Sequence, residues 1–269
     1  MTEQKHHYHL RIAKHFKGEN AIVFGVFWLM AFVWIWSRGA ASYIPTPMQV
    51  LAAFPRVWNE RGLGVNLFDS LELNLQAVSI MFVISYSIAL ATTFPGIWGK
   101  LFRPLSVLVS SGRFNGMVGL PLIFTSMFHE AHKVKIALLV FGMGVFTVLS
   151  LAKLFQNVTK DLYDHSRTLR MSEWRVVWEV VVLGTIDQVI DILRINMAMG
   201  WMMLPIIEGR FKFEGGVGAM MEIDSKQFDY PAVFAVIIVI LLVGLGQDGL
   251  IALFKKIACP YASLGLERA

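Results

Sequence analysis

Long apolar stretches are the feature that most constrains this chain, because about 20 apolar residues form an α-helix long enough to cross a bilayer. Six such stretches occur, at residues 21–37, 75–94, 105–128, 136–153, 189–207 and 232–254. With 56% hydrophobic and only 16% charged residues, the sequence is too apolar for an ordinary soluble domain. We therefore expect an all-α integral membrane protein with six transmembrane helices. No internal repeat or low-complexity linker divides residues 1–269, which indicates a single transmembrane domain.

The distribution of positive charge predicts the orientation of the chain. Fourteen Lys and Arg residues lie in the two tails and in the segments 95–104 and 153–188, against eight in the opposite loops. Because cytoplasmic loops carry the excess of positive charge, we expect both termini in the cytoplasm. The first span contains Trp28, Trp34 and Trp36, and this bulky composition favours a retained helix over a cleaved signal peptide.

Two segments on the expected outer side are long enough to fold. The first follows Ile44-Pro45-Thr46-Pro47 and has apolar residues at helical spacing, which predicts a short amphipathic surface helix carrying Val50, Leu51, Phe54 and Val57. The second, residues 209–230, contains Gly215-Gly216-Val217-Gly218 and is expected to turn back toward the membrane.

Motifs of enzymatic chemistry are missing or incomplete. Residues 96–101 read GIWGKL, which has the wrong spacing for a phosphate-binding loop and no Ser or Thr after the lysine. His129 and His132 are three residues apart, whereas a zinc protease requires a spacing of four, so we interpret them as part of a polar turn between helices. We expect His6, His7 and His9 to belong to a solvated tail, with metal binding as the alternative. We thus expect no catalytic residue and no metal site, and the dispersed basic residues do not favour nucleic acid.

Charged residues inside apolar spans are costly and often mark a transport path. Arg113 lies in the third stretch, close to Asn115, and could either border such a path and meet an anion or form an ion pair with Glu208 that only holds helices together. In the fifth stretch one helix face carries Asp187, Asp191 and Arg194, which favours pairing or snorkelling at the cytoplasmic boundary. Packing is the default role for the nearby methionines, and a soft-metal path is the alternative for Met197, Met199, Met202 and Met203.

The segment from Asp164 to Glu208 begins charged and amphipathic and continues into an apolar span. Its first residues, 164–174, read DHSRTLRMSEW. This resembles the cytoplasmic loop E-A-A-R-T-L-G-A-S-x-W of the permease subunits of bacterial binding-protein-dependent ABC importers, particularly the nitrate/sulfonate/taurine type. The later L-R and W-x6-E motifs of that family fall without a gap on Leu193-Arg194 and on Trp201 and Glu208. Further matches over about residues 40–256 are Ile44-Pro45-Thr46-Pro47, Pro121-Leu122 and Gly216-Val217-Gly218.

The resemblance implies a permease subunit in the bacterial inner membrane. Its expected partners are a cytoplasmic ABC ATPase dimer, a second permease copy or paralogue, and a periplasmic or surface solute-binding protein. ATP and magnesium would be bound by the ATPase, so this chain would need no cofactor of its own. Within the 157–188 loop, residues 162–178 would transmit the movement of the ATPase, through contacts at Asp164, His165, Ser166, Arg167, Arg170, Met171 and Trp174. A small polar or anionic solute would pass a translocation path that includes Arg113, Asn115, Asn196, Met199, Trp201 and Glu208.

Several residues depart from the family pattern. Arg170 stands where the family has glycine, and a residue with a side chain in a left-handed turn costs roughly 1 to 2 kcal/mol, so the turn is either strained or different. His165 and Ser166 replace two alanines that pack against the ATPase. The two family prolines align with Leu183 and Asp187, which predicts a straighter, more continuous helix into the fifth span. Two alternatives therefore remain: a divergent permease-like subunit of a heteromeric complex, or an ATP-independent channel or assembly protein.

Overall fold

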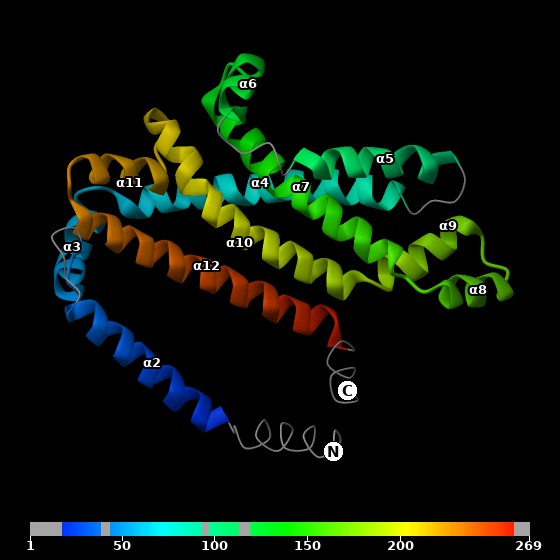
Figure 1. Ribbon diagram of the computed structural model, residues 1–269, viewed down its shortest axis with the longest axis horizontal. Coiled ribbons are helices and arrows are strands. Elements are labelled where there is room, and N and C mark those ends of the chain that lie inside the picture. The colour runs from blue at the N-terminus through cyan, green and yellow to red at the C-terminus, as the bar shows by residue number, and fades with distance from the viewer. Residues whose placement is uncertain (1–17, 39–43, 93–96, 113–118, 261–269) are drawn as a thin grey trace, which may run out of the picture.

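The computed structural model describes residues 18–38, 44–92, 97–112 and 119–260. Within these ranges the regular elements are all helical (Figure 1). The first half contains α2 (Gly18–Arg38), α3 (Pro47–Asn59), α4 (Leu63–Ala91), α5 (Ile97–Ser111), α6 (Leu120–Met127) and α7 (Ala131–Gln156). The second half contains α8 (Lys160–Thr168), α9 (Glu173–Val176), the π-helix η2 (Val177–Leu183), α10 (Ile186–Arg210), the short η3 (Lys212–Glu214), α11 (Val217–Lys226) and α12 (Tyr230–Ala258).

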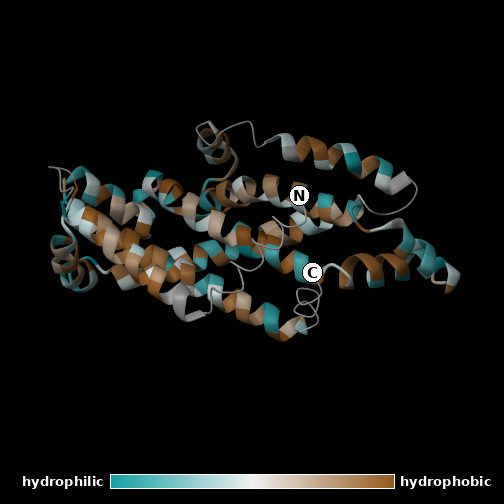
Figure 2. Cartoon of the chain, turned by 60° about the horizontal axis from the view of Figure 1, so that its bottom comes forward, coloured by the Kyte–Doolittle hydropathy of each residue, from teal (hydrophilic) through white to brown (hydrophobic). Residues whose placement is uncertain are grey.

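In the described part of the chain, four helices are long and apolar enough to cross a membrane: α4, α7, α10 and α12. They coincide with the predicted spans 75–94, 136–153, 189–207 and 232–254. Figure 2 shows that apolar residues dominate these long helices, whereas polar residues are most frequent near their ends. These four spans could be predicted because an uninterrupted apolar run of this length has few alternatives to a helix.

The other two predicted spans look different. Residues 21–37 lie in α2, but the apolar described part of that helix, Val23–Arg38, is shorter than the four long helices. The predicted span 105–128 is divided between α5, which ends at Ser111, and α6, which begins at Leu120. Residues 113–118 between them lie outside the described ranges. Six transmembrane helices and cytoplasmic termini therefore stay predictions.

Helix α10 is the centre of the bundle, because it packs against α4, α7, α11 and α12. Figure 1 shows α4, α7, α10 and α12 running alongside one another, with α3 and α11 at one end and α8 and α9 at the other. We call these the α3/α11 end and the α8/α9 end. The core between the long helices includes Met81, Leu138, Leu139, Met143 and Leu204, all fully buried.

The amphipathic helix predicted after the proline pair is confirmed as α3. Thr46 and Gln49 form a capping box, in which each side chain bonds to the main chain of the other, and Pro47 occupies the first turn. Val50 and Val57 are buried on its inner face, whereas Leu51 is exposed.

Ion pairs hold the α3/α11 end together. Arg61 pairs with both Asp224 and Asp229, and Arg56 binds Asp229 with an N–O distance of 2.7 Å. These contacts connect α3 and the residues just before α4 with α11 and with the residue that precedes α12. Residues 209–230 therefore fold back onto the bundle, as η3 and α11.

Candidate functional site

Residues 160–183 form α8, α9 and η2, and Figure 1 shows them at the α8/α9 end, between the end of α7 and the start of α10. We call this stretch the α8–η2 segment. Among the predicted ATPase contacts, five are exposed: Asp164, His165, Arg167, Arg170 and Trp174. Met171 is half-buried. Ser166 is buried, and its hydroxyl donates to the carbonyl oxygen of Leu162 at 2.8 Å, so its side chain is turned away from the surface.

The turn between α8 and α9 is a Schellman turn. Arg170 has a φ of 55°, in the left-handed region, and its N–H donates to the carbonyl oxygen of Arg167 at 2.9 Å. The N–H of Met171 donates to the carbonyl oxygen of Ser166 at 3.3 Å. This pair of bonds is the pattern that normally places glycine where Arg170 stands. The chain thus keeps the left-handed turn and accepts its strain, which decides between the two possibilities raised by the sequence.

The surface of the α8–η2 segment combines apolar and charged side chains. Its exposed large apolar residues are Leu162, Leu169, Trp174, Trp178 and Leu183. Arg167 pairs with Glu173 at 3.4 Å, and Arg175 pairs with Glu179 at 2.7 Å. The hydrogen bond to Glu179 raises the pKa of Arg175 above its ordinary value. Exposed tryptophans beside arginines are typical of protein–protein interfaces.

The connection into α10 corrects one expectation. Instead of a straight continuous helix, the structure has the π-helix Val177–Leu183 followed by a turn at Gly184 and Thr185. The Thr185 hydroxyl donates to the carbonyl oxygen of Val181 at 2.6 Å. A Cβ added to Gly184 would lie 2.3 Å from the carbonyl oxygen of Val180, so only glycine fits. The absence of proline at Leu183 and Asp187 therefore did not make the helix continuous. Gly184 and the Thr185 hydroxyl support a different break in the regular helix at this point.

Among the predicted path residues that the structure describes, Trp201, Glu208 and Met199 each line a different cavity. Arg113 and Asn115 lie outside the described residues. Asn196 is buried and its side-chain N–H donates to the carbonyl oxygen of Ile192 at 2.8 Å. Met199 is half-buried and lines a cavity on the outer side of α10. Trp201 is buried, and its indole N–H donates to the side chain of Gln247 in α12.

Glu208 is 1% exposed and forms a joint between α10, α4 and α11. Its carboxylate accepts hydrogen bonds from the Ser70 hydroxyl at 2.7 Å and from the Gly218 N–H at 2.8 Å. The N–H of Val217 donates to the Ser70 hydroxyl at 2.9 Å. Glu208 and Ser70 thereby bind the free N–H groups at the start of α11, where a negative charge is favourable.

The glycines of the Gly216-Val217-Gly218 motif are required by this joint. Gly216 has a φ of 99°, and a Cβ there would lie 2.4 Å from the Glu208 carboxyl. A Cβ on Gly218 would lie 2.4 Å from the carbonyl oxygen of Pro205. The structure therefore explains why the glutamate and the glycines occur together in the sequence.

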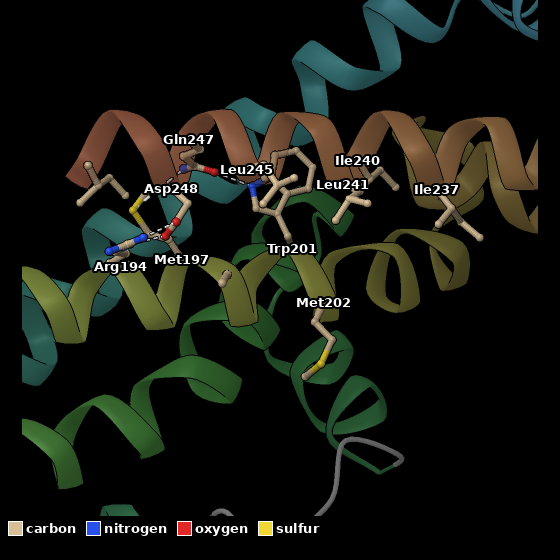
Figure 3. A pocket seen from close by; sticks show the side chains of 13 residues that line it. Arg194, Met197, Trp201, Met202, Ile237, Ile240, Leu241, Leu245, Gln247 and Asp248 are labelled. Carbon is tan, nitrogen blue, oxygen red and sulfur yellow. Dashed lines mark hydrogen bonds and ion pairs between the residues drawn. The ribbon is translucent and has the colours of Figure 1, made fainter. Parts of the chain in front are cut away.

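Polar pairs connect α10 to α12, as Figure 3 shows for part of this interface. Arg194 forms an ion pair with Asp248, and Asp191 forms one with Lys255. Pairing, one of the two alternatives expected for this helix face, is thus confirmed for Asp191 and Arg194, although their partners were missed. Asp187 forms no ion pair with the described residues, and a position at the cytoplasmic boundary stays a prediction. The partners lie 54 and 64 residues further along the chain, and only the charge of Asp248 inside an apolar span could have pointed to it.

The histidine motif begins between α6 and α7 with His129 and continues into the first turn of α7 with His132. The carboxylate of Glu130 pairs with Lys133 at 2.9 Å, and the ring of His132 lies 3.2 Å from the side-chain oxygen of Gln76. Among the described residues, no group of three or more His, Cys, Asp or Glu side chains could hold a metal ion.

An all-helical bundle with several membrane-length helices defines the class as a helical membrane protein, in which the α8–η2 segment is exposed. Residues 21–256 match the family described as binding-protein-dependent transport system inner membrane component, and the chain belongs to this family. It is an inner-membrane permease component of an ABC transporter, a family whose members work with ATPase and solute-binding partners. A search of curated protein sequences gave no match.

Proposed function

We propose that this chain is an importer permease that couples to a separate cytoplasmic ATPase through residues 162–178. The observation that supports this role is the exposure of Arg167 and Trp174 on two short helices held by the Schellman turn. Because α7 leads into the α8–η2 segment and α10 leads out of it, a displacement of this segment would reach two long helices of the bundle. A bound ATPase would cover the exposed apolar side chains of this segment.

The remaining parts of the transporter follow from the same proposal. The α8/α9 end would face the cytoplasm, as would both termini, and a solute-binding protein would approach the α3/α11 end. A second permease copy or a paralogue would complete the translocation path. The solute would be small and polar or anionic, as in the nitrate/sulfonate/taurine type. Arg170, which forms no ion pair with the described residues, favours a divergent docking contact, because it adds a guanidinium at a position where the family has no side chain.

Copurification tests this proposal directly. The full chain, tagged and extracted from its native membranes, should bring down an ATPase whose hydrolysis rises when an external binding protein is added. Arg167→Glu and Trp174→Ala should each lose most of the recovered ATPase. Trp58→Ala is the matched control, since Trp58 is similarly exposed but lies in α3 at the other end. Normal ATPase recovery in both variants would show that the docking surface lies elsewhere, and a stable complex without any ATPase would overturn the proposal.

A further inference from the structure

The Arg194–Asp248 ion pair lies well inside two membrane-length helices. Arg194 is in the third turn of α10, and Asp248 is followed by nearly three turns of α12. At 1.5 Å per residue, these positions are roughly 12 to 15 Å from the helix ends at the α8/α9 end. Since the hydrocarbon core of a bilayer is about 30 Å thick, both side chains lie at membrane depth if the helices cross it.

This ion pair is on the surface of the described bundle. The side chains of Arg194 and Asp248 are 39% and 37% exposed. They line a cavity of about 390 Å³ between α10 and α12, together with Trp201 and Gln247. The same two side chains also line a second cavity, of about 750 Å³, on the outer side of α10 with Met199. The pair therefore lines both cavities.

Figure 3 shows how the side chains are arranged around the Arg194–Asp248 pair. Arg194 and Asp248 meet between α10 and α12, and Trp201 extends from α10 toward Gln247, while Met202 points away from α12. Closer to the helix ends, the pair Asp191 and Lys255 continues the same polar strip. A polar strip thus leads from the α8/α9 end to the cavity between the two helices.

Apart from Lys256 in the last turn, the other exposed side chains of α12 are apolar. Its exposed side chains include Leu242, Leu250, Leu253, Phe254 and Ile257, as expected for a surface that faces lipid. An exposed ion pair among hydrocarbon chains is costly, and intramembrane charges are usually found facing protein or a water-filled cavity. The two faces of α12 therefore have different surroundings.

We propose that the Arg194–Asp248 pair borders the water-filled translocation path and is a charged contact for solute passing between α10 and α12. This inference rests on the proposed role of the chain as the subunit that forms the path. It adds two residues that the sequence motifs did not place there, and one of them, Asp248, belongs to the sixth predicted span. An anionic group of the solute could bind Arg194, and a cationic group could bind Asp248, only after the ion pair between them opens. The pair therefore discriminates among solutes by their charge.

Cysteine accessibility tests the proposal without knowledge of the solute. Cys259 is the single cysteine of the chain, so Cys259→Ser provides a background for Ala198→Cys, Asp248→Cys and Leu250→Cys in the full-length protein. Membranes containing each variant would be treated with membrane-impermeant methanethiosulfonates, one anionic and one cationic. Ala198 lines both cavities and leaves the ion pair intact, whereas Leu250 is 69% exposed on the other face of α12.

We expect the cysteines at positions 198 and 248 to react at least tenfold faster than the one at position 250. In Asp248→Cys the unpaired Arg194 should make the anionic reagent several-fold faster than the cationic one, and an added Arg194→Gln should abolish that preference. Equal rates at all three positions, or no reaction at 198 and 248, would overturn the proposal. Cysteine labelling requires no ATPase, so its outcome can be interpreted even if the copurification experiment fails. A failed labelling experiment would likewise leave the copurification result unaffected.

Discussion

The main-chain N–H of Met171 donates a hydrogen bond to the carbonyl oxygen of Ser166, and this bond closes α8 around Arg170 in a left-handed conformation. The turn geometry has thus been retained although the glycine that favours it is absent. The strain is local, because the neighbouring hydrogen bonds of the turn are formed. Arg170 therefore combines an energetic cost with a guanidinium placed on the exposed α8–η2 segment.

Arg170→Gly should stabilise the protein by about 1 kcal/mol, because glycine adopts the left-handed region without steric cost. Thermal unfolding of the detergent-solubilised protein measures this change. Arg170→Ala is the control, since it removes the guanidinium and keeps the strain, and its stability should stay close to that of the parent. If alanine stabilised as much as glycine, the effect would come from the loss of charge.

Gly218→Ala should destabilise the protein by about 1 to 3 kcal/mol, because the new methyl group overlaps the main chain of Pro205. Gly246→Ala is a matched control in α12, where a Cβ meets no other group within 4 Å. The control should be neutral or slightly stabilising, since alanine is the better helix former. Similar unfolding temperatures for the two variants would contradict the close approach of α11 to α10.

Glu208→Ala should cost about 2 to 4 kcal/mol, because it leaves the Ser70 hydroxyl and the Gly218 N–H buried without their acceptor. Glu208→Gln should cost clearly less. Its amide oxygen can accept from Gly218, and its amide N–H can donate to the Ser70 oxygen. Unfolding curves of the two variants, measured at equal detergent concentration, give the comparison. Equal losses would indicate that the negative charge, and not the hydrogen bonding, is what the joint requires.

Glu222 should make the stability of the protein change with pH in the acid range. Its pKa is lowered below the ordinary value of 4.5 by hydrogen bonds to Lys226 and Lys212, with ion-pair distances of 3.3 Å to each. A carboxyl with a lowered pKa stabilises the folded state above its unfolded pKa, and this contribution is lost as the pH falls through the folded pKa. The unfolding temperatures of the parent and of Glu222→Gln should therefore differ at neutral pH, begin to converge as the pH falls below about 4.5, and meet only below the folded pKa. A difference that persisted in acid, or that ignored added salt, would exclude the ion pairs as its cause.

Much of the fold could be predicted from local patterns. Apolar runs indicated the positions of α4, α7, α10 and α12, and the apolar spacing after Pro47 indicated α3, although its capping box was not predicted. The family motif marked residues 162–178 as a distinct segment because they are consecutive in the chain, but it did not predict their division into α8, α9 and η2. The limits of α4 were harder to predict, since Leu63 and Leu73 extend this helix through a stretch that also contains charged residues.

The partners of the intramembrane charges could not be predicted in the same way. Arg194 and Asp248 meet only because α10 and α12 pack together, and no local pattern sets their relative rotation. Glu208 illustrates the same limit. Its position was matched through a sequence motif, but its role as an acceptor for the start of α11 depends on how far the chain folds back after Arg210.

The π-helix Val177–Leu183 also sets the angular phase between the α8–η2 segment and α10. A π-helix has more residues per turn than an α-helix, so each residue advances by a smaller angle around the axis. A helical wheel drawn with a constant α-helical angle from Trp174 to Trp201 therefore places the residues after the π-helix on the wrong face of the helix. The face that α10 presents to its neighbours is fixed by this change of pitch and by the turn at Gly184.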